Sequence, residues 1–138
     1  MFRHLAALAV AAAALPAWAQ DAQATRDDIA ATLGMTPSFV AGIADSALPG
    51  LWTQIKALEL SGDTALDAKT KALISLGVAA QIPCQYCIWM DTNSARAAGA
   101  TDQEIAEAVA ISGLTRNMST IFYGTQTDFE QFRKEFGG

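Results

Sequence analysis

The sequence predicts an all-α protein. Apolar residues recur at spacings of three and four in several segments, and no segment alternates polar and apolar residues over the length of a β-strand. Gly, Pro and Ser/Thr/Asp residues stand between these segments, where helices end and begin. A single Cys-x-x-Cys pair, Cys84 and Cys87, lies at the predicted start of one helix. This pair is the candidate for chemistry.

Residues 1–19 have the pattern of a secretory signal peptide. A short basic segment precedes eleven residues, Leu5 to Leu15, that are all Leu, Ala or Val. Pro16 then precedes Ala17-Trp18-Ala19, which matches an A-x-A cleavage site. A spanning helix needs about 20 apolar residues, so an uncleaved anchor is disfavoured. We expect a periplasmic or secreted protein whose mature domain is residues 20–138.

The mature domain would be acidic. Cleavage removes the single histidine and leaves eight Lys and Arg against fourteen Asp and Glu, a net charge of −6. Nucleic acids and anionic membranes bind clusters of Lys and Arg, so we expect neither as a partner after cleavage. About 120 residues make one domain. In an oxidising compartment such as the bacterial periplasm, two thiols persist as a disulfide.

The first half of the mature domain shows three short helical patterns. After a loose start from Gln20, Thr25 is the expected cap of a helix that Gly34 ends. Pro37 stands near the first position of the second helix. Its inward residues should be Phe39, Val40 and Ile43. The third pattern runs from Leu51 to Leu60 and ends at a Ser-Gly-Asp turn.

Two helices should flank the cysteines. One runs from Asp67 to about Ile82, and Pro83 interrupts it. Its expected apolar stripe is Leu73, Ile74, Gly77 and Val78. The next helix begins at Cys84 and ends at Gly99, a C-cap glycine.

Two further helices complete the chain. Thr101-x-x-Glu104 matches a capping box and should open a long helix that ends near Gly124. The last helix, 127–136, places three phenylalanines at spacings of three and four: Phe129, Phe132 and Phe136. We interpret the large side chains Trp52, Tyr86, Trp89 and Met90 as core or subunit interface, with a substrate pocket beside the cysteines as the alternative.

Several roles for the cysteine pair can be weighed. A zinc site commonly takes four Cys or His ligands, and the mature chain offers two Cys and no His, so we expect no metal. Attachment of c-type haem requires C-x-x-C-H, but Ile88 follows Cys87, and we expect no cofactor. A structural disulfide stays open, although so short a loop gives little stabilisation. Thioredoxin places its C-x-x-C in a βαβ context, whereas helical patterns flank this pair.

A redox role has a direct physical basis. At a helix start after Pro83, Cys84 and Cys87 meet unpaired backbone N–H groups and the positive end of the helix dipole. That environment lowers a thiol pKa and favours the reactive thiolate. With its partner three residues away, the first sulfur to be oxidised is resolved into an intramolecular disulfide.

Three stretches around the pair stand at fixed distances from one another. They read Lys69-Thr70-Lys71-x-Leu73-Ile74, Cys84-Gln85-Tyr86-Cys87-Ile88 and Ala95-x-x-x-Gly99-Ala100-Thr101-x-x-Glu104-Ile105-x-Glu107-Ala108. Together with Leu33-Gly34-x-x-Pro37-x-Phe39 and Trp52, they resemble the carboxymuconolactone decarboxylase/AhpD-like family. The resemblance covers residues 33–124, most of the mature domain.

The resemblance implies an all-helical fold with the C-x-x-C at a helix N-terminus, in a homo-oligomer (a trimer or a hexamer). It further implies that Cys87 is the peroxidatic thiol and Cys84 the resolving thiol. Redox members of the family also carry a relay glutamate and a relay histidine, and these positions hold Ala72 and Asp91 here. Asp91 lies four residues after Cys87, on the same helix face, which makes it the third candidate catalytic residue. It would serve as a base only if burial made it more basic; the other interpretation is a solvated or ion-paired carboxylate.

The leading hypothesis is an exported AhpD-like thiol redox protein of the peroxiredoxin or alkylhydroperoxidase type. It would reduce peroxides or disulfides through Cys84 and Cys87, with a small hydroperoxide or a thiol/disulfide protein as its reaction partner. Lactone decarboxylation, the other family activity, should need general acid–base groups, and the mature domain has no histidine to supply one. The alternative is a non-catalytic member with a structural disulfide and a binding or assembly role.

Overall fold

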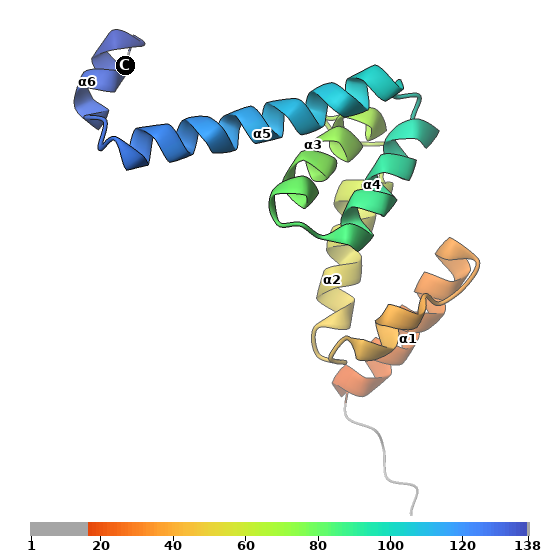
Figure 1. The fold of residues 1–138 in the computed structure, drawn as a ribbon. Helices are drawn as coiled ribbons and strands as arrows, with labels where there is room; N and C mark the ends of the chain where they lie inside the picture. The colour runs from red at the N-terminus through yellow and green to blue at the C-terminus, as the bar shows by residue number, and fades with distance from the viewer. Residues whose placement is uncertain (1–16, 138) are drawn as a thin grey trace, which may run out of the picture. The chain divides into compact units, whose positions relative to one another are not determined.

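The computed structural model describes residues 17–137, with side chains from Asp21 onward, and every regular element within that range is helical (Figure 1). The predicted all-α fold is therefore confirmed. The chain divides into two compact units, Met1–Leu60 and Ser61–Gly138. The first contains α1 (Ala17–Leu33), the 3₁₀ helix η1 (Ser38–Gly42), α2 (Leu48–Ile55) and the π-helical turn η2 (Lys56–Leu60). The second contains α3 (Ala68–Gln81), α4 (Gln85–Ala97), α5 (Asp102–Gly124) and α6 (Phe129–Glu135).

The first helix begins earlier than predicted. We expected a loose start and a cap at Thr25, but α1 is helical from Ala17 and contains Thr25 in its interior. The Thr25 hydroxyl donates to the Asp21 carbonyl oxygen at 2.7 Å, which is how a threonine satisfies itself inside a helix. The alanine-rich stretch favours helix strongly enough to continue through it. The predicted end is confirmed, because Gly34 follows α1 with φ of +75°.

The predicted signal peptide, residues 1–19, lies largely outside the described residues. Because α1 begins at Ala17, the expected cleavage site after Ala19 falls in its first turn. Among the helices that the structure describes, none is both long and apolar enough to cross a membrane.

The first unit has a small apolar core. Ile29 of α1, Val40 of η1 and Leu48 and Trp52 of α2 are buried together, and Ile43 and Ile55 pack against them. Val40 and Ile43 therefore turn inward as predicted. The prediction for Phe39 is wrong, since 59% of this residue is exposed. A 3₁₀ helix has three residues per turn instead of 3.6, so neighbouring side chains diverge from the face that α-helical spacing predicts.

One carboxylate ties α1 to α2 at the edge of this core. Asp28 accepts a hydrogen bond from the Trp52 indole N–H at 2.7 Å and a second from the Lys56 ammonium. A second ion pair joins Arg26 to Asp45. The indole of Trp52 is thus buried with its one polar atom satisfied.

In the second unit, α3 packs against both α4 and α5 (Figure 1). Asp67 caps α3 by accepting the Thr70 N–H at 2.7 Å, and its backbone bonds lower the pKa of the Asp67 carboxyl. The buried residues of this unit are small except for one: Ala72, Leu76, Ala79 and Ala95. Alanines at the contacts allow the helices to approach closely.

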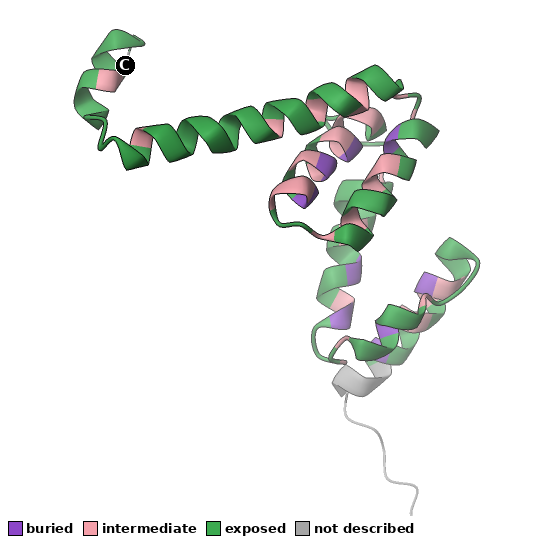
Figure 2. Ribbon diagram, in the orientation of Figure 1, coloured by how far each residue is buried: buried purple, intermediate pink, exposed green. Residues whose placement is uncertain are grey.

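The predicted apolar stripe of α3 is partly wrong. Leu73 and Gly77 are half-buried, whereas Ile74 and Val78 are more than half exposed. The buried residues of α3 are instead Ala72, Leu76 and Ala79. Figure 2 shows buried segments along α3 in purple. The sequence predicted large apolar side chains on the buried face of α3, but mainly alanines form that face in the structure.

The capping box at the start of α5 is confirmed. The Thr101 hydroxyl accepts the Glu104 N–H at 3.1 Å, and the Glu104 carboxylate accepts the Thr101 N–H at 2.7 Å. Beyond its contact with α3, α5 continues as an extended helix to α6 (Figure 1). There the Phe122 ring contacts Phe132 edge-on at 5.1 Å between centroids, and Phe136 lies 4.7 Å from Phe132. Phe129 and Phe136 are nevertheless mostly exposed.

Candidate active site

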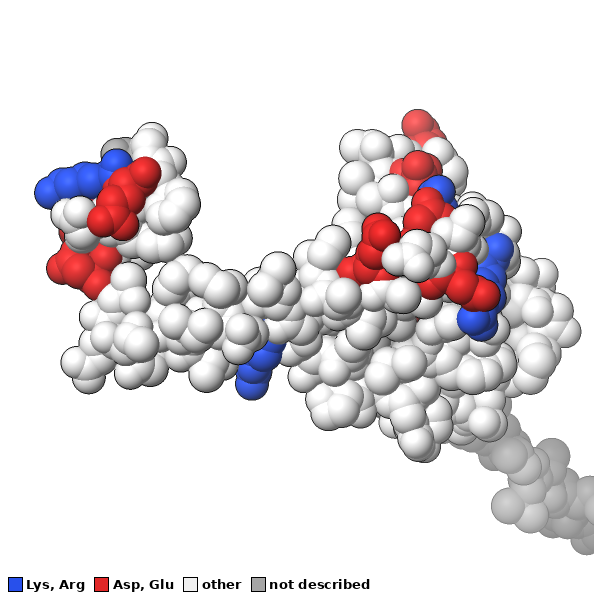
Figure 3. Space-filling model, turned by 45° about the horizontal axis from the view of Figure 1, so that its top comes forward, with Lys and Arg blue, Asp and Glu red and all other residues white. Residues whose placement is uncertain are grey.

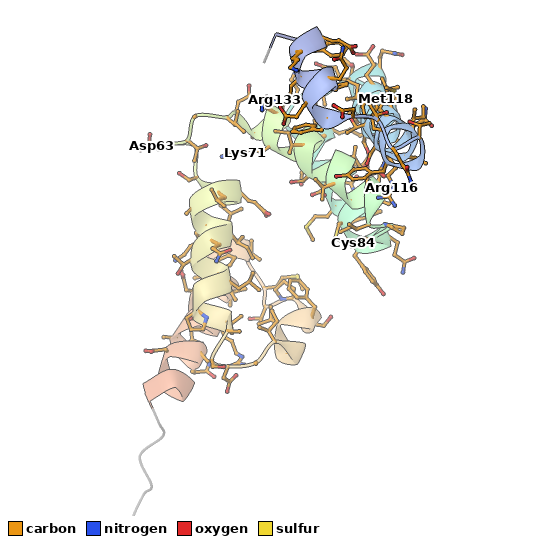
Figure 4. All side chains as sticks on the ribbon, turned by 90° about the vertical axis from the view of Figure 1, so that its left-hand side faces the viewer. Asp63, Lys71, Cys84, Arg116, Met118 and Arg133 are labelled. Carbon is orange, nitrogen blue, oxygen red and sulfur yellow. A yellow bond between two sulfur atoms is a disulfide. The ribbon has the colours of Figure 1, made fainter. Side chains whose placement is uncertain are left out.

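The cysteine pair lies where α3 gives way to α4. The Ile82 N–H donates to Val78 at 3.1 Å and closes α3, and the Cys84 N–H then donates to the Ala79 carbonyl oxygen at 3.1 Å. Pro83 stands between them, where its missing N–H removes no helical bond. In Figure 4, Cys84 lies at the end of α3 opposite Lys71. The sequence signals on both sides of Pro83 therefore predicted the position of the pair correctly.

Cys84 and Cys87 form a disulfide across the first turn of α4, with their Cα atoms 5.3 Å apart. Cys84 is the N-cap of the helix, and its sulfur accepts the Cys87 N–H at 3.3 Å. Its carbonyl oxygen accepts the Ile88 N–H at 2.9 Å. Both cysteines are half-buried. The predicted placement at a helix N-terminus is confirmed, with Cys84 as the capping residue itself.

Three large side chains that follow Cys84 on α4 are exposed to solvent. Tyr86 is 76% exposed and Trp89 71%, and Met90 is half-exposed. A shallow groove beside them is lined by Gln85, Ile88, Trp89, Thr92, Asn93 and Arg96. Core packing is thus excluded for these three side chains of α4, whereas Trp52 belongs to the core of the first unit. An interface role for the α4 residues stays a prediction.

The structure describes both positions at which the family resemblance implies a proton relay. Ala72 is buried in α3, with 8% of its surface exposed. Asp91 lies on α4, half-buried and one turn beyond Cys87. The structure thus places Asp91 on the same helix as the pair, at the predicted spacing. Its catalytic role stays a prediction.

A polar link between α3 and α5 supports the end of α3 that leads into the pair. The Gln81 side-chain amide donates to the Ser112 hydroxyl at 2.8 Å, and that hydroxyl donates to the Gly77 carbonyl oxygen at 2.8 Å. Sequence reasoning missed this link. The available signal was a pair of small residues, Gly77 and Ser112, within the mostly apolar stretches 73–80 and 108–114.

Two ion pairs fix the other end of the scaffold. Lys69 of α3 donates to Glu104 of α5 at 2.7 Å, and Arg96 at the end of α4 bonds Asp102 at 2.9 Å. The Lys69 ammonium, followed by the Thr101 N–H, holds the pKa of Glu104 at about 2, below its ordinary value of 4.5. Within residues 17–137, His, Cys, Asp and Glu side chains form no cluster of three or more that could hold a metal ion.

These features define a class: a helical scaffold that presents a Cys-x-x-Cys disulfide at a helix N-terminus. The model of the carboxymuconolactone decarboxylase family matches residues 46–124, more than half of the chain. The chain therefore belongs to the carboxymuconolactone decarboxylase family. The match spans α2 to the end of α5 and includes both cysteines.

A solved structure agrees with this assignment. The fold is similar to the crystal structure of the alkylhydroperoxidase AhpD core from Rhodospirillum rubrum, with a TM-score of 0.67 and 31% identity. The alignment covers 82% of this chain and 86% of that chain. The predicted AhpD-like resemblance is thereby confirmed.

A protein of Paracoccus denitrificans described as uncharacterized protein 4 in the cox locus is 41% identical over 54 residues. That alignment covers 39% of this chain and 49% of the relative, so the match spans about half of the relative's length.

Proposed function

We propose that this protein is a thiol oxidoreductase of the alkylhydroperoxidase type, which reduces hydroperoxides or disulfides through Cys84 and Cys87. The observation that carries the proposal is the disulfide in the first turn of α4, inside a family scaffold related to an alkylhydroperoxidase core. A disulfide that spans three residues ties no distant segments together, so it contributes little to stability. A short, half-buried pair at a helix N-terminus suits reversible two-electron chemistry instead.

The first experiment is the reduction potential of the pair, measured by alkylation trapping across a dithiol redox series. A potential between about −270 and −120 mV, the span of thiol oxidoreductases, supports the proposal. A potential below about −300 mV is that of a stable structural disulfide and contradicts it. The double variant Cys84→Ser/Cys87→Ser should also abolish thiol-dependent peroxide consumption, and an unchanged rate in that variant would remove the pair from the reaction.

The second candidate is a non-catalytic family member with a structural disulfide and a binding or assembly role. The observation in its favour is the buried Ala72, together with Asp91, at the relay positions. Neither side chain can take up a proton and become a cation, as the relay histidine can. A structural potential, together with peroxide consumption that is unchanged in the double variant Cys84→Ser/Cys87→Ser, would favour this candidate.

The protein is further proposed to act as a homo-oligomer, a trimer or a hexamer. The support is the large apolar surface of the second unit, which leaves Ile74, Val78, Ile111 and Leu114 more than half exposed. Ile74 and Ile111 line one shallow groove between α3 and α5, and exposed apolar patches mark interaction sites. The expected reaction partners are a small hydroperoxide or a thiol/disulfide protein.

Export to the periplasm or the outside of the cell is part of the proposal. Its support is the signal-peptide pattern of residues 1–19, and an oxidising compartment would keep the pair oxidised until a donor reduces it. Mass spectrometry of the protein purified from its source cells should find an N-terminus at Gln20. A protein that retains residues 1–19 would overturn this part.

A further inference from the structure

The two sulfurs of the pair occupy different positions relative to α4. Cys84 is the N-cap residue, with extended backbone at φ −86° and ψ 96°, and its sulfur accepts the Cys87 N–H at 3.3 Å. Backbone bonds on both sides, from its N–H to Ala79 and from Ile88 to its carbonyl oxygen, hold this position without the disulfide. The sulfur of Cys84 stands where a serine or aspartate oxygen usually caps a helix.

Ionisation of an N-cap cysteine to the thiolate strengthens the interaction of its sulfur with the helix N-terminus. A charged acceptor makes a stronger hydrogen bond to an N–H than a neutral one, and the positive end of the helix dipole adds to this. Cys87 is the third residue of the helix, and its N–H is the donor that the Cys84 sulfur uses. The backbone therefore stabilises negative charge on Cys84 more directly than on Cys87.

The cations of the three packed helices are Lys69, Lys71, Arg96 and Arg116. In α3 they are Lys69 and Lys71, at the end opposite Cys84, bound to Glu104 and to the Ser61 carbonyl oxygen (Figure 4). The remaining titratable side chains of α4 and α5 are Tyr86, Asp91, Arg96, Asp102, Glu104, Glu107, Arg116 and Tyr123. Arg96 is paired with Asp102.

The charged side chain one turn from Cys87 is thus an acidic one, Asp91. A carboxylic acid, whether neutral or ionised, supplies no positive charge to a Cys87 thiolate. The contact that the structure shows for stabilising a thiolate is the Cys87 N–H at the helix N-terminus, and it is made to the Cys84 sulfur.

We propose that Cys84 is the attacking thiolate in this protein and Cys87 the resolving thiol, the reverse of the order that the family resemblance implies. This inference rests on the proposed function. With a disulfide substrate, the Cys84 sulfur attacks one substrate sulfur, forms a mixed disulfide and releases the other as a thiolate. Cys87 then loses its proton and attacks the Cys84 sulfur, which closes the Cys84–Cys87 disulfide and releases the second substrate thiolate.

The electron balance is the same for a hydroperoxide. The Cys84 thiolate takes the terminal oxygen as a sulfenic acid and releases the alcohol once its alkoxide is protonated. The Cys87 thiol condenses with that sulfenic acid, and water leaves as the disulfide forms. In each reaction the pair gives up two electrons, and a dithiol donor must return them.

The test is differential alkylation of the fully reduced wild-type protein with iodoacetamide between pH 5 and pH 10, read by peptide mass spectrometry. At pH 7 we expect Cys84 to be labelled about ten times faster than Cys87, because a helix N-terminus moves a thiol pKa from about 8.5 toward about 7. Faster labelling of Cys87, or equal labelling at every pH, would overturn the inference.

The matched pair Cys84→Ser and Cys87→Ser gives an independent readout that also separates the two proposals. With 5,5′-dithiobis(2-nitrobenzoate) as the probe, Cys87→Ser, which keeps Cys84, should form the mixed disulfide faster than Cys84→Ser at pH 7. The opposite order would leave thiol exchange in place and overturn only the assignment of roles. A wild-type pair that dithiols cannot reduce would instead overturn the proposed function.

Discussion

At the residue scale, Ala72 and Asp91 occupy the two positions at which the family resemblance implies a relay glutamate and a relay histidine. Both lie within the scaffold that carries the cysteines, Ala72 buried in α3 and Asp91 on α4. A relay of glutamate and histidine would add proton transfer at the second cysteine, and general acid–base catalysis contributes about 10²–10⁴-fold. The family resemblance gave these two positions, the first directly after Lys69-Thr70-Lys71 and the second four residues after Cys87, and their relay role stays a prediction.

The double variant Ala72→Glu/Asp91→His should therefore increase peroxide consumption, by about 10²-fold if the relay is complete. It should also raise the iodoacetamide reactivity of Cys87 relative to Cys84. Burial at position 72 will make the variant less stable by about 1–3 kcal/mol. The matched control is Ala72→Gln/Asp91→Asn, which has similar shapes but cannot transfer protons. An equal increase in both variants would show that the relay is not the cause.

A second prediction at this scale concerns Glu104. Its pKa of about 2 in the folded protein lies below the ordinary value of 4.5, so Lys69 and the Thr101 N–H stabilise the fold through its ionised form. That stabilisation is fully present above pH 4.5 and is lost as the pH falls toward 2. Asp28, beside Lys56, and Asp67, capping α3, have lowered pKa values and act in the same direction.

Glu104→Gln isolates this contribution, because glutamine still accepts the Thr101 N–H in the capping box. The free energy of unfolding of the variant should fall less steeply between pH 5 and pH 2 than that of the wild type. Urea titrations followed by circular dichroism at each pH provide the measurement. Parallel curves would mean that the Lys69–Glu104 pair, which is partly exposed, contributes nothing measurable.

At the scale of the element, helix ends were predicted better than helix faces. Gly34, Asp67, Gly99 and the Thr101 capping box mark ends that the structure confirms, because a cap depends on a few neighbouring residues. The start of α1 was missed, because Thr25 can cap a helix or bond inside one.

Which face of a helix is buried depends on the other helices that pack against it, and the local sequence does not specify those helices. In α3 the alanines turned out to be buried and Ile74 and Val78 exposed, because α3 packs closely against two helices. The link from Gln81 through Ser112 to Gly77 was missed for the same reason: it joins residues 31 and 35 positions apart. The candidate cysteines were found because their spacing and their helix start are both local.

Two glycines, one after a helix end and one inside a helix, test whether local backbone conformation decides the effect of a substitution. Gly99 follows α4 with φ of +86°, so Gly99→Ala should destabilise the protein by about 1 kcal/mol or more, although nothing lies within 4 Å of the added Cβ. Gly77 is inside α3, where a Cβ would meet the Ser112 Cβ at 3.6 Å, an ordinary contact.

Gly77→Ala should therefore be neutral or stabilise by about 0.5–1 kcal/mol, because alanine favours a helix interior. Thermal unfolding of both variants provides the comparison. Destabilisation by Gly77→Ala would indicate that α3 and α5 pack more closely than the structure has them.

At the scale of the whole molecule, many large apolar side chains of the described residues are exposed to solvent, and few are buried in a core. Hydrophobic residues make up 51% of the sequence, but the largest side chains that are fully buried are Leu48 and Leu76. Several of the exposed side chains lie on α5, where Ile111, Leu114, Met118 and Ile121 recur at spacings of three, four and three. These residues form one stripe of the helix, called here the α5 stripe.

The α5 stripe begins beside α3, where Ile111 lines a shallow groove with Ile74 and Gly77, and its later residues Leu114, Met118 and Ile121 turn away from α3 by helical register. Ala108 and Ser112, which approach Gly77, fall on a different side of α5 by helical register. After Glu107 the only charged residue of α5 is Arg116, and Figure 3 shows the middle of this helix as a surface with little charge. A stripe without charge on an extended helix fits the proposed homo-oligomer.

Leu114→Glu is the sharpest test of that assembly. Leu114 is 60% exposed, so in a monomer the change should affect the free energy of unfolding by less than about 0.5 kcal/mol. In an oligomer that buries the stripe, each copy would bring an unpaired charge into an apolar interface, at a cost of several kcal/mol. Sedimentation should then show a trimer or hexamer for the wild type and smaller species for Leu114→Glu. Thr120→Glu, which adds the same charge on the opposite side of α5, should leave the assembly intact; if both variants assemble like the wild type, the α5 stripe is not the interface.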